Sequence, residues 1–128
     1  MWYFDSSAIL AALLQQKNSD LIKDLLSQDI CTSRLSRIEV FRSISKLAPE
    51  LRQVGEEFFA RCAVIEMERT FLKRAEEYSQ EITLKSADAI HVATVECLQL
   101  LISGIVTLDR QMISNAKRLG IKVYEPAS

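Results

Sequence analysis

Short apolar runs alternate along this chain with longer segments of helical composition, and this alternation restricts the fold more than any other feature. The apolar runs predict strands at residues 2–4, 30–32, 63–65, 105–108 and 121–124. The segments between them predict helices at residues 8–16, 20–28, 37–46, 49–61, 70–80, 87–101 and 110–119. Strands that alternate with helices form βα units, which build a mainly parallel sheet with helices on both faces. We therefore expect an α/β fold with a five-stranded sheet.

Proline and glycine are scarce, and three of these residues are predicted to begin or end a helix. The chain has 2 Pro and 3 Gly, which argues against long linkers and against all-β folds with many turns. Pro49 fits the first turn of a helix. Gly104 is predicted to end the helix before the fourth strand, and Gly120 to cap the helix before the fifth.

The net charge is close to zero. The chain has 128 residues, the length of one domain, and its 16 Lys and Arg against 17 Asp and Glu give a formal charge of −1. A hydrophobic content of 48% excludes intrinsic disorder. A protein that binds nucleic acid by bulk positive charge would be more basic. Any contact with nucleic acid must therefore rest on local basic residues or on another chain.

The cysteines and the N-terminal segment indicate a cytoplasmic setting. Cys31, Cys62 and Cys97 form no CxxC pair, so the sequence offers no zinc knuckle or redox motif. Each lies in an apolar run, where a free cysteine packs as a small hydrophobic residue. The first residues lack the pattern of a signal peptide, and no apolar stretch is long enough to predict a membrane span.

Four acids fall where a parallel sheet would gather them. Asp5 and Asp109 end predicted strands. Glu39 lies in the first turn of the helix after the second strand, and Asp88 in the first turn of the helix that leads into the fourth. Ligands of open α/β folds bind outside the carboxyl ends of the strands, so we expect all four acids at that end.

Such a cluster would have a chemical consequence. Two like charges about 4 Å apart cost roughly 4 kcal/mol at an effective dielectric of 20. The cluster would therefore take up protons or bind hard cations such as Mg²⁺ or Mn²⁺. Metal-dependent hydrolysis of a phosphodiester is the resulting hypothesis.

Each acid also has a purely structural interpretation. Asp5 and Asp109 are suited to capping the helices that follow them. Glu39 fits a capping box in which its carboxylate reaches back to the Ser36 amide, and Asp88 would complement a helix dipole. Position alone does not select the four acids, because others lie near helix starts or a strand end: Asp20, Glu50 and Glu68.

The single histidine, His91, follows Asp88 by three residues. This spacing allows it to face the same cleft, but a polar residue on the helix surface is the favoured interpretation. No serine or cysteine nucleophile motif accompanies it, and the chain contains no GxGxxG, P-loop or HExxH motif. Nucleotide binding and zinc proteolysis therefore have no support.

Five short motifs follow one another along the chain. They are YFDSSAIL at 3–10, TSRLSRIEVFR at 32–42, SADAIHVAT at 86–94, VTLDR at 106–110 and LGIKV at 119–123. In this order and at this length the chain resembles the PIN-domain family, in particular the VapC-type ribonuclease toxins of bacterial toxin–antitoxin pairs. The resemblance covers nearly the whole chain.

The resemblance implies which side chains form the site. The catalytic and metal-binding acids would be Asp5, Glu39, Asp88 and Asp109. Ser7 and Thr107 would be supporting polar groups near the metal. Basic residues placed near the same end of the sheet are candidates for binding RNA phosphates, with solvated surface charge as the alternative: Arg34, Arg37, Arg42, Lys46 and Arg110. Arg42 also has the spacing to pair with a carboxylate instead.

The same resemblance implies a fold and a function. The fold would be PIN-like, with residues 1–128 forming a single PIN domain. The activity would be that of an endoribonuclease dependent on Mg²⁺ or Mn²⁺, with tRNA as the first expected substrate class. The partners would be a VapB-type antitoxin and a second copy of the chain. Two alternatives stay open: a PIN nuclease of RNA maturation or decay without an antitoxin, and an interaction module without catalysis.

Overall fold

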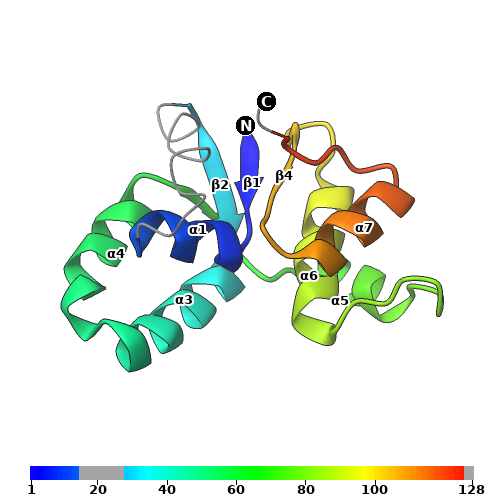
Figure 1. The fold of residues 1–128 in the computed structure, drawn as a ribbon. Coiled ribbons are helices and arrows are strands. Elements are labelled where there is room, and N and C mark those ends of the chain that lie inside the picture. Colours follow the sequence, from blue (N-terminus) through cyan, green and yellow to red (C-terminus); the bar gives the residue numbers. More distant parts are fainter. Residues whose placement is uncertain (15–27, 126–128) are drawn as a thin grey trace.

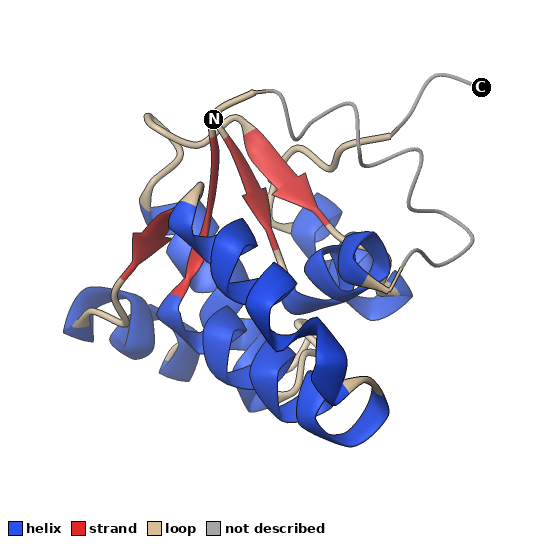
Figure 2. Cartoon of the chain, turned by 90° about the vertical axis from the view of Figure 1, so that its left-hand side faces the viewer, coloured by secondary structure: helices blue, strands red, loops and turns tan. Residues whose placement is uncertain are grey.

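The computed structural model describes residues 1–14 and 28–125, which form an α/β fold around a parallel sheet (Figure 1). The sheet has four strands in the order β3-β2-β1-β4. Their bounds are β1 Trp2–Phe4, β2 Ile30–Ser33, β3 Ala63–Ile65 and β4 Gly104–Val106. Every pair of neighbours is parallel, so the carboxyl ends of the strands lie at one end of the sheet (Figure 2). The predicted fold class is confirmed.

The helices lie close to their predicted positions. They are α1 Ser6–Leu13, α3 Arg34–Leu47, the 3₁₀ turn η2 Pro49–Leu51, α4 Arg52–Ala60, α5 Arg69–Glu76, α6 Ser86–Cys97 and α7 Arg110–Arg118. The helix predicted at 20–28 lies outside the described residues, apart from residue 28, as does the end of the one predicted at 8–16. No helix in the described ranges is long and apolar enough to cross a membrane.

The sheet separates two groups of helices. In Figure 1, α1, α3 and α4 lie on one side of the central strands, and α5, α6 and α7 lie on the other. Adjacent strand residues point to opposite faces. Phe4 accordingly joins the apolar cluster beneath the first group of helices, and Tyr3 joins the cluster beneath the second. Both side chains are fully buried.

The predicted fifth strand forms only a single parallel bridge, between Ile105 and Val123. The Ile105 amide donates to the Lys122 carbonyl, and the Tyr124 amide donates to the Ile105 carbonyl, both at 2.9 Å. The segment therefore adds to the edge of β4 without extending into a ladder. The prediction of five strands was one too many because β-branched composition indicates an extended segment but does not supply a long pairing register.

Gly104 has a different role from the predicted one. Helix α6 already ends at Cys97, and Gly104 is the first residue of β4. A Cβ atom at Gly104 would lie 2.4 Å from the Lys122 carbonyl oxygen and 2.8 Å from the Trp2 ring. The glycine thus allows the close approach of a neighbouring backbone. Gly120, in contrast, has a φ of 75° and follows the end of α7, so its predicted capping role is confirmed.

Candidate active site

Asp5 lies at the end of β1 and is only 2% exposed. One carboxylate oxygen, Oδ1, accepts from the Ala8 amide at 3.0 Å and from the Ser7 hydroxyl at 2.7 Å. The other, Oδ2, accepts a short hydrogen bond from the Thr107 hydroxyl. Asp5 therefore caps α1, as its structural interpretation predicted, and it also lies at the carboxyl end of the sheet.

The turn after β4 is tied to Asp5 through two hydroxyl groups. Thr107 Oγ1 accepts from the Asp109 amide at 3.1 Å, and Ser7 Oγ accepts from the Leu108 amide at 3.0 Å. Asp109 caps α7 by accepting from the Met112 amide at 3.0 Å through Oδ1. The predicted supporting residues Ser7 and Thr107 thus hold the two strand-end acids on one network.

Glu39 is held by a buried histidine. Its Oε1 lies 2.6 Å from His91 Nε2, and the Tyr3 hydroxyl lies 2.6 Å from His91 Nδ1. His91 is 0% exposed, so the favoured prediction of a surface histidine was wrong. It becomes buried because both ring nitrogens find polar partners on other elements.

The capping box proposed for Glu39 is also absent. Helix α3 begins three residues earlier than predicted, and its N-cap is Ser33, whose side chain accepts from the Leu35 amide. Ser36 lies inside the helix, where its hydroxyl accepts from Thr32 at 2.7 Å. The prediction that Glu39 lies in the first turn of its helix is therefore wrong: α3 has no acid in its first turn, and the Glu39 side chain contacts His91 of α6.

The electrostatics of Asp88 show that the acids lie near one another. Burial raises the pKa of Asp88, and the charges of Asp109, Glu39 and Asp5 raise it further, while His91 opposes the rise. Burial also raises the pKa of Asp5, against the hydrogen bonds from Thr107, Ser7 and Ala8. Helix α6 has Lys85 as its N-cap, and among the described residues the Asp88 side chain accepts no hydrogen bond. The charges of the other three predicted acids thus act on Asp88, which has no hydrogen-bond partner among the described residues.

The donor set fits a hydrated hard cation. Within residues 1–14 and 28–125, no three Asp, Glu, His or Cys side chains are close enough to enclose a metal ion. Mg²⁺ is commonly bound through one or two carboxylates and keeps several of its waters, so it does not need an enclosed site. Four carboxylates that repel one another supply oxygen ligands and negative charge of the kind that Mg²⁺ and Mn²⁺ prefer.

The predicted RNA-binding arginines fall into two groups. Arg34, Arg37 and Arg42 line one hollow of about 370 Å³ on α3, together with Arg52 from α4. Arg110 is exposed at the first position of α7, next to Asp109. The structure thus places three of the four on one surface.

The arginines in the hollow differ in how they are held. Arg37 pairs with Glu56 at 3.2 Å and stacks over the Phe41 and Phe59 rings. Arg34 and Arg42 are exposed, and neither forms an ion pair with a described residue. Lys46 was expected near the acids, but it lies in the last turn of α3, and the start of this helix is the end that meets the sheet.

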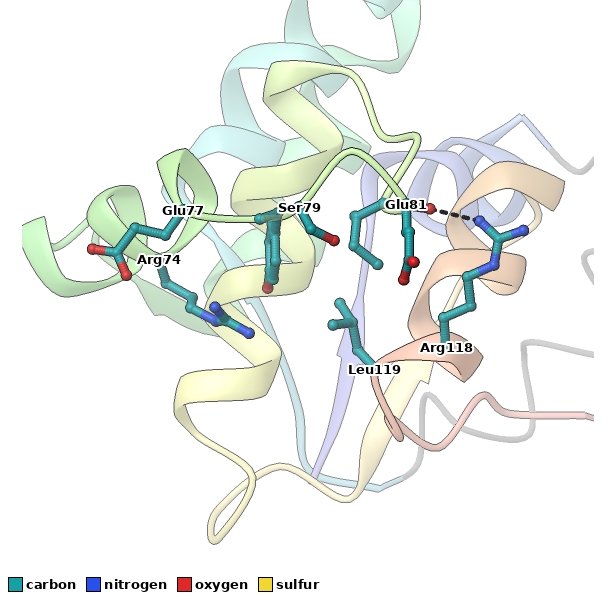
Figure 3. Close-up of a pocket in the computed structure, with 8 residues that line it drawn as sticks. Arg74, Glu77, Ser79, Glu81, Arg118 and Leu119 are labelled. Atoms are coloured by element: carbon teal, nitrogen blue, oxygen red, sulfur yellow. Dashed lines mark hydrogen bonds between the residues drawn. The ribbon is translucent and has the colours of Figure 1, made fainter.

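A second cavity, of about 760 Å³, lies between α5, the segment that follows it and the end of α7 (Figure 3). None of the predicted site residues lines it. Its two arginines are already engaged: Arg74 pairs with Glu96 at 2.6 Å, and Arg118 donates to the Glu81 carbonyl at 2.8 Å. The cavity is therefore separate from the acidic site.

Comparisons with known proteins identify the family of the chain. The model of the PIN domain family matches residues 2–119. The chain is 29% identical over 127 residues to ribonuclease VapC46 of Mycobacterium tuberculosis, covering 98% of this chain and 97% of that protein.

Solved structures share the fold. A toxin–antitoxin complex from Klebsiella pneumoniae matches with a TM-score of 0.79 at 16% identity, over 99% of this chain and 98% of that one. VapC20 of M. tuberculosis, described as a toxin that cleaves the sarcin–ricin loop, matches with a TM-score of 0.75 at 14% identity, over 98% and 100% of the two chains.

Proposed function

The chain belongs to the PIN-domain family, and from this premise we propose that it is a metal-dependent endoribonuclease of the VapC type. The observation that carries the proposal is the position of Asp88. Its carboxyl group lies in the field of Asp109, Glu39 and Asp5 and has no hydrogen-bond donor of its own among the described residues. A bound divalent cation would remove this repulsion, which structural roles for the separate acids leave unexplained.

The proposed roles follow from the contacts of each side chain. Asp5, Asp88 and Asp109 would bind Mg²⁺ or Mn²⁺ directly or through water, and Glu39 would complete the shell or orient a water. A cation at this place would lower the pKa of a bound water and would neutralise charge that develops on the phosphodiester. Ser7 and Thr107 would keep the Asp5 carboxylate ionised and oriented, because both hydroxyl groups donate to it.

The RNA would be held by basic residues beside the acids. Arg34 and Arg42 are exposed in the α3 hollow, and Arg110 is exposed beside Asp109. We assign phosphate contacts to these three arginines, because guanidinium groups bind phosphates through charge-assisted hydrogen bonds. Arg37 lines the same hollow, but its pairing with Glu56 gives it a second role in joining α3 to α4.

The partners are proposed by similarity. The curated relative is a VapC ribonuclease, and one structural neighbour is a toxin–antitoxin complex. We infer that this chain forms a homodimer and binds a VapB-type antitoxin that blocks the acidic site. We propose tRNA as the substrate class, with ribosomal RNA as the alternative suggested by the description of VapC20.

Incubation of the purified protein with total RNA tests this function. We expect cleavage of a discrete RNA with Mg²⁺ or Mn²⁺, no cleavage with EDTA, and none by Asp88→Asn. A suitable control is Glu96→Gln, which alters an acid on the same helix that pairs with Arg74. Cleavage that persists in EDTA, or full activity of Asp88→Asn, would contradict the proposal. Cleavage of tRNA, ribosomal RNA or neither decides the substrate class.

A further inference from the structure

Three side chains from three elements form a hydrogen-bonded chain beside the acidic site. Tyr3 lies on β1, His91 on α6 and Glu39 on α3. Tyr3 and His91 are both 0% exposed. The ring of His91 touches one partner through each nitrogen, at 2.6 Å on both sides. The proposed roles of the four acids do not explain why these three side chains are hydrogen-bonded to one another.

The Glu39 carboxylate and the Tyr3 hydroxyl, which lie on either side of His91, set the direction of the hydrogen bonds. An ionised carboxylate only accepts, so His91 Nε2 must carry the proton that it donates to Glu39 Oε1. In the neutral tautomer with its proton on Nε2, Nδ1 accepts, and the Tyr3 hydroxyl is the donor within reach. Burial raises the pKa of Tyr3 well above its usual value, so the hydroxyl keeps its proton.

The hydrogen bonds from Tyr3 through His91 restrain one carboxylate oxygen of Glu39 and leave the other oxygen available. Oε1 is held by His91, and the side chain is 29% exposed. The Glu39 charge also reaches the cluster, since it contributes to the raised pKa of Asp88. A long side chain that would otherwise sample several rotamers is thus fixed beside the other acids.

We propose that His91 is a positioning residue that holds Glu39 so that Oε2 faces the cation site, and that Tyr3 fixes the imidazole tautomer. This inference rests on the proposed function, because it needs a cation near Glu39. Mutation of a side chain that is hydrogen-bonded to a metal ligand and orients it commonly lowers metal affinity or activity by about 10-fold to 100-fold. We therefore expect loss of the Tyr3 hydroxyl to weaken cation binding by about tenfold.

A double-mutant cycle tests the proposal with Mn²⁺ binding measured by calorimetry. The variants are Tyr3→Phe, Glu39→Ala and the double variant. Tyr3→Phe keeps the aromatic ring that packs edge-on against His91, which favours a folded protein. The matched control is Tyr78→Phe, which removes a hydroxyl group that donates to Glu96 at 2.9 Å and lies outside the acidic site.

The expected result is a loss of about tenfold in Mn²⁺ affinity for Tyr3→Phe, and of less than about twofold when the same change is made on Glu39→Ala. Tyr78→Phe should bind Mn²⁺ as the wild type does. An equal loss in both backgrounds, or no loss in either, would overturn the positioning role alone. A wild-type protein that binds no Mn²⁺ would overturn the proposed function together with this inference.

Discussion

Thr107 joins the two strand-end acids, and the change Thr107→Val tests its role. Valine keeps the β-branched shape of this buried side chain but has no hydroxyl group. The change removes a hydrogen bond to the Asp5 carboxylate, worth about 1.5–3 kcal/mol. It also removes the acceptor of the Asp109 amide, which adds about 1 kcal/mol. We expect the free energy of unfolding to fall by about 2.5–4 kcal/mol.

Urea unfolding measures this loss. With a slope of about 2 kcal/mol per molar, the midpoint should fall by about 1–2 M. The control is Thr107→Ser, which keeps the hydroxyl group and loses one methyl group, at a cost of about 1 kcal/mol. The hydroxyl group also opposes the rise in the pKa of Asp5, so Thr107→Val should bind Mn²⁺ more weakly than the wild type. The reasoning would be refuted if the valine variant were as stable as the serine variant.

Further changes give separate outcomes. The folded state raises the pKa of Asp88, so it binds more protons than the unfolded state, and stability falls as the pH rises from about 4 through that raised pKa. In metal-free buffer Asp88→Asn should therefore flatten this part of the stability curve and be more stable at pH 7, as urea unfolding would show. Arg34→Met should weaken RNA binding in a filter assay with little change in stability. Arg37→Met should lower the melting temperature, because it removes both the ion pair with Glu56 and the stacking of the guanidinium on the Phe41 and Phe59 rings. Gly104→Ala should lower the free energy of unfolding by about 1–3 kcal/mol, since its Cβ atom would meet a backbone carbonyl.

The acids could be located from the sequence because their placement is local. Asp5 and Asp109 directly follow strands and begin helices, and both features appear within a few residues of each. Asp88 is likewise in the first turn of its helix. The parallel topology then brings these positions together. Short-range patterns therefore placed these acids at the carboxyl end of the sheet, but other acids fit the same rule, and the resemblance to the PIN-domain family was needed to select the four.

The contacts around the acids could not be predicted in the same way. The partners of His91 are Tyr3, 88 residues away, and Glu39, 52 residues away. The sequence shows only a polar residue on an amphipathic helix, which is the pattern of a surface position. The pairing of Arg37 with Glu56 also depends on how α4 packs against α3. Such contacts depend on tertiary packing, which local composition does not encode.

The central claim is that Asp5, Glu39, Asp88 and Asp109 form a cation site. A crystal grown with Mn²⁺ and measured near the manganese absorption edge would test it most directly, because anomalous scattering locates the ion. We predict an anomalous peak beside Asp88, at the carboxyl end of β1 and β4, and its loss in Asp88→Asn. The absence of a peak there, or a peak only in the cavity beside Arg74 and Arg118, would contradict the claim.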